Sequence, residues 1–255
     1  MDSFILKNDF KICYPILEYN FEKFIKKINE KKIEKGVMLE LRIDYLLNSG
    51  IELKDIIFFI NNYVSKGNAD RLIVTIRTVG EGGKVDLSRE IYFNYIKELY
   101  QKLKVKYIDV EFKFYNANRE LYDNLFKSHK KKVIISIHFF DRVFHPAEYE
   151  KLFIEMAKSH GDIVKCAIMP YTENDFFTYM MAAKNAYKVL KKHKKECIFI
   201  AMGDIGKLSR IWPEFTNSKI VFLSAYSENA NNLGQFGRET FDKFRNILEK
   251  NGKNW

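Results

Sequence analysis

The sequence has few residues of the kinds that cross-link or interrupt a chain: three cysteines, four prolines and 12 glycines among 255 residues. Cys13, Cys166 and Cys197 are odd in number, lie in apparent strands and have no metal-ligand spacing. This excludes a disulfide framework and favours small core residues in a reducing compartment, so we expect a cytoplasmic protein without a metal site. No proline-rich or glycine-rich linker is present, which predicts one domain over residues 1–255 with a short polar tail at 251–255.

Long apolar runs are missing as well. No stretch approaches the roughly 20 residues needed to cross a bilayer. The segment Met1–Phe10 lacks the basic and then apolar pattern of a secretory signal. We therefore expect no membrane partner. The chain does contain 47% apolar and 15% aromatic residues, which is enough for a sizeable globular core.

The formal net charge of +10 permits a polyanion or a small acidic molecule as partner. Much of the excess lies in lysine runs at 130–132 and 191–195, which flank ordinary amphipathic helices and are typical of solvated faces. No motif interleaves arginines with aromatic residues as nucleic-acid-binding motifs do. We expect no nucleic-acid partner and a small anionic substrate.

Short apolar stretches alternate with helical patterns at a repeat of about 30 residues. Eight stretches in 255 residues match the size of an α/β protein with a single-domain (β/α)8 TIM barrel. An open doubly wound sheet would usually have fewer strands and a glycine-rich first turn. The expected strands are Lys11–Ile16, Val37–Ile43, Arg71–Ile76, Lys106–Phe112, Lys132–His138, Asp162–Ile168, Glu196–Met202 and Lys219–Leu223, and the main expected helices are Phe21–Ile33, Ile51–Val64, Glu90–Leu103, Arg119–Phe126, Ala147–Ala157, Asp175–Leu190 and Arg238–Leu248.

The sixth stretch carries a lysine in an apolar strand that a proline closes. Because side chains alternate along a strand, Lys165 shares a face with Ile163 and Ala167. Burial disfavours the ammonium form, and a neutral amine attacks ketones and aldehydes to form an imine. The alternative is a lysine whose stem packs while its amine reaches solvent at the rim of the sheet.

Polar residues gather where other expected strands end, which is where barrel enzymes carry their chemistry. Glu40, Arg42 and Asp44 share one face of the second strand, either to grip hydroxyl groups or as a structural ladder of ion pairs. Arg77 leads into a glycine-rich loop that we expect to be flexible. Glu81 in this loop would repel a phosphate, which opposes a phosphate cradle.

The fifth strand ends with His138, one strand before the lysine. Adjacent strands lie about 4.8 Å apart, so His138 and Lys165 could reach one small substrate, and histidine suits proton transfer near neutral pH. Asp109 and Glu111 end the fourth strand and lie behind the site or pair with an arginine. Arg210 suits a bidentate grip on a carboxylate, and the loop 227–237 is long enough to act as a lid.

Taken together, these residues resemble the type I 3-dehydroquinate dehydratases, and the resemblance covers nearly the whole chain. It implies a (β/α)8 enzyme that is typically dimeric and dehydrates 3-dehydroquinate to 3-dehydroshikimate without a metal or organic cofactor. The matching motifs, in the order of the family, are Glu40-x-Arg42-x-Asp44, Arg77-Thr78-x-x-Glu81-Gly82-Gly83, Asp109-x-Glu111, Ser136-x-His138, Lys165-x-Ala167-x-Met169-Pro170, Met202-Gly203-x-x-Gly206-x-x-Ser209-Arg210 and Gly234-Gln235.

The resemblance also implies residue roles. Lys165 would form the imine with the C3 ketone, and His138 would take the C2 proton and return it to the departing C1 hydroxyl. Glu81 would orient the imidazole, as carboxylates commonly do. The expected substrate-binding residues are Glu40, Arg42, Arg77 and Gln235 on the hydroxyls and the carboxylate end, Arg210 on the carboxylate, Met202 against the ring, and Asn231 in the lid.

Three positions depart from the family pattern. Asn231 replaces a serine that touches substrate, Phe139 replaces an aspartate after the histidine, and Pro15 replaces a serine found in some members. Two other functions stay open. A class I aldolase could use the same lysine. It would need a site for a sugar phosphate, and the carboxylate of Glu81 would repel the phosphate group. A non-catalytic basic protein could bind polyanions through its charge alone.

Overall fold

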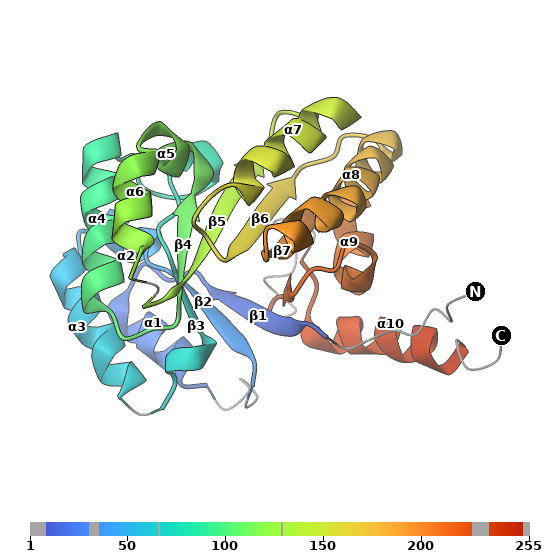
Figure 1. The fold of residues 1–255 in the computed structure, drawn as a ribbon. Helices are drawn as coiled ribbons and strands as arrows, with labels where there is room; N and C mark the ends of the chain where they lie inside the picture. Colours follow the sequence, from blue (N-terminus) through green and yellow to red (C-terminus); the bar gives the residue numbers. More distant parts are fainter. Residues whose placement is uncertain (1–8, 31–35, 66, 129, 226–234, 252–255) are drawn as a thin grey trace.

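The computed structural model describes residues 9–30, 36–65, 67–128, 130–225 and 235–251. Eight parallel strands form one sheet in the order β7-β6-β5-β4-β3-β2-β1-β8, with helices between them (Figure 1). This nearly closed barrel confirms the expected (β/α)8 fold. The strands are β1 (Lys11–Ile16), β2 (Met38–Arg42), β3 (Leu72–Thr75), β4 (Tyr107–Glu111), β5 (Lys132–Phe139), β6 (Ile163–Ile168), β7 (Glu196–Ala201) and β8 (Ile220–Phe222).

The helices follow the expected pattern with three differences. The first helix ends at Ile28 rather than at residue 33, because Asn29 caps it and donates from its side chain to the Ile25 carbonyl at 2.9 Å. Two short helices after β2 and β4 were not expected. The last helix includes Asn251, which we expected in the tail, and residues 252–255 lie outside the described part. The helices are α1 (Phe21–Ile28), α2 (Asp44–Asn48), α3 (Leu53–Val64), α4 (Arg89–Lys102), α5 (Phe112–Ala117), α6 (Arg119–Phe126), α7 (Pro146–Ala157), α8 (Glu173–Lys192), α9 (Leu208–Ile211) and α10 (Arg238–Asn251).

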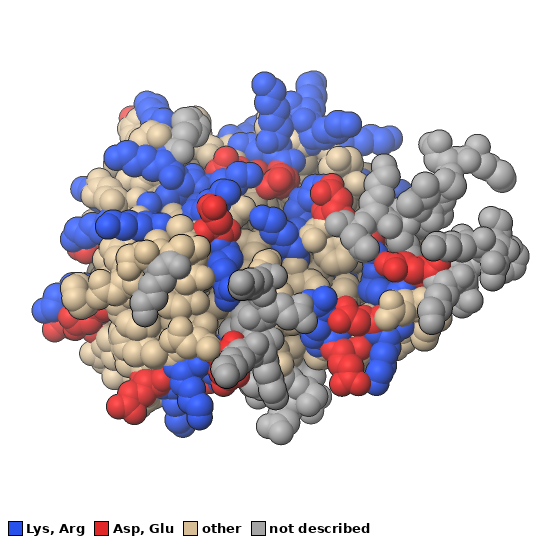
Figure 2. Space-filling model, turned by 90° about the horizontal axis from the view of Figure 1, so that it is seen from below, with Lys and Arg blue, Asp and Glu red and all other residues tan. Residues whose placement is uncertain are grey.

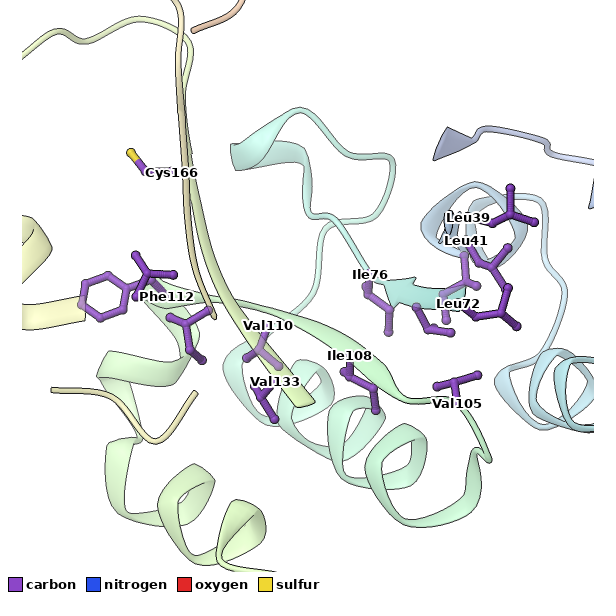
Figure 3. Close-up of a cluster of buried hydrophobic side chains, with 14 of the residues drawn as sticks. Leu39, Leu41, Leu72, Ile76, Val105, Ile108, Val110, Phe112, Val133 and Cys166 are labelled. Carbon is purple, nitrogen blue, oxygen red and sulfur yellow. The ribbon is translucent and has the colours of Figure 1, made fainter. Parts of the chain in front are cut away.

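Alternation along the strands divides the core into two layers. On β6, Val164, Cys166 and Ile168 face outward and pack in the layer between sheet and helices. Ile163 and Ala167 face the interior of the barrel, as expected. Figure 3 shows part of the outer layer, with Leu39, Leu41, Leu72, Ile76, Val105, Ile108, Val110, Phe112, Val133 and Cys166 labelled. Burial of this layer is the main apolar contribution to stability.

The inward face of the barrel has an apolar half and a polar half. Near the amino ends of the strands, apolar side chains fill the interior, and two positions further along β2 to β6 the inward side chains become polar. The apolar half contains Cys13, Met38, Ile73, Tyr107, Ile134, Ile163, Ile198 and Ile220. The polar half contains Glu40, Thr75, Arg77, Asp109, Glu111, Ser136 and Lys165, all of them buried. The candidate site is therefore at the carboxyl ends of the strands.

The barrel closes less tightly between β7 and β8 than elsewhere. One isolated bridge joins Cys197 to Ser218, and the Lys219 amide donates to the Cys197 carbonyl at 2.8 Å. The side chain of Ser218 accepts a hydrogen bond from the Phe199 amide at 2.9 Å. A side chain thus replaces part of the backbone ladder at this seam.

The surface carries mixed charge. On the face seen in Figure 2, lysines and arginines are interspersed with aspartates and glutamates rather than gathered in one stripe. Within the described ranges, no helix has the length and apolarity needed to cross a membrane.

Candidate active site

Lys165 lies inside the barrel on β6 and is 3% exposed. Its Nζ atom is 3.2 Å from Glu40 Oε1, 3.6 Å from Asp109 Oδ2 and 4.3 Å from the centre of the Phe222 ring. The expected burial is confirmed, and the alternative of an amine that reaches solvent is wrong. Two carboxylates offset the cost of burying the charged amine.

Glu40 and Arg42 have different partners although they share a strand face. Glu40 Oε1 accepts hydrogen bonds from Lys165 and from the Thr75 hydroxyl, the latter at 3.1 Å. Arg42 donates through Nε and Nη2 to the two oxygens of Asp44 at 2.7 and 2.8 Å. The expected ladder of ion pairs is thus divided: Arg42 forms a bidentate pair with Asp44, and the Glu40 carboxylate contacts Lys165 instead.

His138 and Glu81 form a second pair, with Nδ1 of the imidazole 2.9 Å from Glu81 Oε2. Burial, with help from Arg77, Lys165 and Arg42, lowers the pKa of His138 well below its ordinary value. The imidazole is therefore neutral at pH 7 and able to accept a proton. Burial raises the pKa of Glu81 to about 8. Glu81 therefore ionises near pH 8, and in the ionised form it accepts from Nδ1–H and leaves Nε2 free as a base.

Glu81 lies on a rigid turn, so the expectation of a flexible loop is wrong. The turn η2 (Val79–Glu81) is held by Glu111, whose carboxylate accepts from the Thr78 amide at 2.7 Å and from its hydroxyl at 2.8 Å. Gly83 has no room for a side chain, because a Cβ atom would lie 1.8 Å from the Arg77 carbonyl oxygen. The turn therefore fixes where the Glu81 carboxylate lies.

Arg77 lies behind this pair and is buried among acceptors. It donates through Nη2 to Asp109 Oδ1 at 2.7 Å and through Nη1 to the Ser136 hydroxyl at 2.8 Å. Nη1 is also 3.3 Å from Glu81 Oε2. One guanidinium thus joins the carboxylate near the amine to the carboxylate on the imidazole.

Arg210 is buried on α9, beside the ends of β7 and β8. It donates through Nη1 to the Ala201 carbonyl at 2.9 Å and through Nε to the Phe222 carbonyl at 3.2 Å. Burial lowers its pKa to about 10, so it remains a cation at neutral pH. Met202 is buried after β7 and Gln235 is half-buried, whereas Asn231 lies outside the described residues.

Phe139 and Pro15, the two departures from the family pattern that lie within the described residues, leave the cluster of active-site side chains intact. Phe139 alternates with His138 and packs its ring on Phe144, with the ring centres 4.6 Å apart. It is part of the outer layer. Pro15 is half-buried on β1, in register with Glu40.

Sequence reasoning missed two neighbours of the amine. The Phe222 ring lies under Lys165, and the Thr75 hydroxyl binds the carboxylate that contacts it. Both residues occupy inward positions on their strands, so strict application of the two-residue alternation would have found them. The distances to the amine depend on how the barrel closes, which no local pattern contains.

The arrangement combines a buried amine, a neutral imidazole and a carboxylate at the carboxyl end of a barrel. Such a set can form an imine and move a proton on an adjacent carbon. In the part of the chain that is described, no group of three or more His, Cys, Asp and Glu side chains could hold a metal ion. Fold and site together define an enzyme of the (β/α)8-barrel class.

Comparison with known proteins identifies the family. A sequence model of the type I 3-dehydroquinase family matches residues 12–252, and the chain belongs to this family. A 3-dehydroquinate dehydratase of Streptococcus suis is 31% identical over 241 residues, which cover 94% of this chain and 99% of that protein. One from Clostridioides difficile is 30% identical over 244 residues, covering 94% and 92%.

Solved structures agree. The crystal structure of type I 3-dehydroquinate dehydratase from Clostridium difficile with covalently modified comenic acid has a TM-score of 0.81 and 28% identity, and the match covers 94% of this chain and 92% of that one. The 3-dehydroquinate dehydratase of Aquifex aeolicus has a TM-score of 0.69 and 28% identity, covering 93% and 98%.

Proposed function

We propose that this protein is a hydro-lyase that converts 3-dehydroquinate to 3-dehydroshikimate through a lysine imine. The observation that carries the proposal is a buried amine and a half-buried imidazole on adjacent strands: His138 is in register with Ala167, two residues after Lys165. Membership of the type I family supports the substrate and the reaction.

The reaction begins at Lys165. Its amine attacks the C3 ketone, and loss of water gives an iminium that withdraws electrons from C2. Glu40 Oε1, at 3.2 Å from Nζ, is placed to accept a proton from the amine as it becomes nucleophilic. The apolar half of the barrel below the amine keeps water from that side.

His138 then carries out the proton transfers. Its Nε2 takes the C2 proton, the C1 hydroxyl departs as water with that proton, and hydrolysis of the imine frees the product. Glu81 holds the imidazole from Nδ1 at 2.9 Å. Because the turn under Glu81 is rigid, the imidazole keeps its orientation through both transfers.

The remaining expected residues surround the substrate in this proposal. Arg210 binds the carboxylate, Met202 contacts the ring, and Arg42, Gln235 and Asn231 bind polar substituents. Arg77 stabilises the carboxylates on which the amine and the imidazole depend. No metal or organic cofactor takes part, so dialysis against a chelator is expected to leave the rate unchanged.

The test is direct. Addition of 3-dehydroquinate is expected to produce the ultraviolet absorbance of a conjugated enone, and borohydride added during turnover is expected to fix the substrate to Lys165. Peptide mass mapping locates the adduct. Absence of the enone signal, or an adduct on another lysine, would falsify the proposal.

We further infer a cytoplasmic homodimer with this small molecule as its substrate. The three buried free cysteines fit a reducing compartment, and the family resemblance supports the dimer. Sedimentation equilibrium at micromolar concentration is expected to give twice the mass of the 30.3 kDa chain. A single-chain mass would reject the dimer without affecting the proposed chemistry.

A further inference from the structure

Asp109 holds one oxygen without a hydrogen bond beside the reactive amine. The residue is on β4 and is fully buried. Its Oδ1 atom accepts from Ser136 at 2.6 Å and from Arg77 at 2.7 Å. Its Oδ2 atom has no hydrogen-bond partner among the described residues and lies 3.6 Å from Lys165 Nζ. A buried carboxylate oxygen without a donor is costly, which points to a function.

The surroundings keep Asp109 ionised. Burial alone would raise the pKa of this carboxyl, but Arg77, Lys165 and Ser136 together lower it below its ordinary value. All hydrogen bonds to the side chain are on Oδ1, so the carboxylate is fixed with Oδ2 directed at the amine. The negative charge is thus present before any substrate arrives.

We propose that Asp109 is the fixed counter-ion of the iminium nitrogen that forms on Lys165. The inference rests on the proposed function. In the step, the ammonium and the ketone give an iminium and one water: the C=N bond forms, the C=O bond breaks, and two ammonium protons leave with the oxygen. The positive charge is conserved, while the nitrogen falls from three N–H donors to one.

The single remaining N–H goes to Asp109 rather than to Glu40. Glu40 Oε1 already accepts from the Thr75 hydroxyl at 3.1 Å, and the proton that it takes from the amine leaves with the departing water. Asp109 Oδ2 has no competing donor in the described structure and no access to solvent. In a medium of low polarity this charge stabilises the iminium much more than it would in water.

Asp109→Asn removes the charge and keeps the shape. We expect imine formation, measured as borohydride-trapped adduct in a single turnover, to slow about 100-fold. Because imine formation then limits the rate, the isotope effect on kcat with C2-deuterated substrate is expected to shrink towards one. A purely structural role would lower the amount of active enzyme without changing the isotope effect.

Ser136→Ala is the matched control, because it removes a hydrogen bond to Oδ1 and leaves the charge. Its trapping rate is expected to fall less than about tenfold. If Asp109→Asn traps substrate as fast as the native protein, the inference is overturned. If the native protein traps nothing, the proposed function itself has failed, so the two failures are distinguishable.

The native protein allows a measurement that does not depend on any variant folding. In a crystal structure of the borohydride-reduced adduct, we expect Asp109 Oδ2 within about 3.2 Å of the adduct nitrogen. A structure in which Glu40 is the carboxylate at that distance, with Asp109 further away, would overturn the assignment.

Discussion

The two halves of the barrel interior share strands β2 to β6 and have similar burial but opposite chemistry. On β6 the inward side chain changes from Ile163 to Lys165, and on β2 from Met38 to Glu40. The apolar half needs no partners. In the polar half, every buried charge lies near one of opposite sign. The first half makes the fold stable, and the second uses that stability to hold reactive groups.

The difference shows what each half supplies to the other. Apolar side chains below the amine exclude water, so the charges above them interact in a medium of low polarity. Buried ion pairs are weak contributors to stability, because desolvation offsets their attraction. Substitutions in the polar half should therefore affect chemistry most, and substitutions in the apolar half should affect stability most.

Lys165→Met tests whether a substitution in the polar half abolishes the chemistry, and it should have the largest effect. We expect turnover to fall by about 10⁴-fold or more and the borohydride adduct to disappear. Among the residues that the structure describes, Lys165 is the one buried lysine. The control is Lys132→Met on the neighbouring strand, whose amine is at the surface and 3.4 Å from Glu196. Trapping that persists in Lys165→Met would contradict the assignment.

His138→Gln separates imine formation from elimination. We expect kcat to fall about 10²- to 10⁴-fold because the proton transfers lose their base, while borohydride still fixes the intact substrate on the lysine. The mass of the adduct, before or after loss of water, reports which step stopped. His193→Gln, at the exposed end of α8, should behave as the native protein.

Glu81→Gln tests how much the buried, ionised carboxylate lowers the stability of the folded protein. The pKa of Glu81 is raised from 4.5 to about 8, so the folded state binds a proton that the unfolded state releases. The native protein should therefore lose stability as pH rises from about 4.5 to 8. Thermal unfolding at pH 5 and pH 9 checks this.

In that experiment, Glu81→Gln should gain stability relative to the native protein as the pH rises. Glu150→Gln, an exposed position on α7, serves as control and should show no such gain. Parallel unfolding curves for the native protein and Glu81→Gln at both pH values would argue that the carboxyl titrates normally.

Ile134→Ala should have the smallest effect on chemistry. Ile134 is fully buried in the apolar half, so the cavity is expected to lower the free energy of unfolding by about 2–5 kcal/mol. The value of kcat should stay within a few-fold, because the charged groups keep their partners. Urea unfolding and steady-state rates measure the two quantities. A large loss of kcat at unchanged stability would show that the halves are not separable.

Much of the fold could be predicted from the sequence, because strands and helices are marked by local patterns of residues. Short apolar runs at a repeat of about 30 residues marked the strands. One of these runs carried Lys165, and the ends of two others led to His138 and Glu81. The partners of these groups depend on distances across the barrel, so the contact of Glu40 with the amine could not be read locally. The rigidity of the Glu81 turn was missed for the same reason, since Glu111 holds it from another strand.

The seam between β7 and β8 determines where the barrel is expected to open locally. A sheet whose strands are joined by few hydrogen bonds at one seam opens there first. The backbone amides of Ser218 and Phe222 should therefore exchange with deuterium in the solvent before those of the other strands. Phe222 forms the floor under the amine. Warming would then wet the pocket, and inactivate it, before the barrel as a whole comes apart.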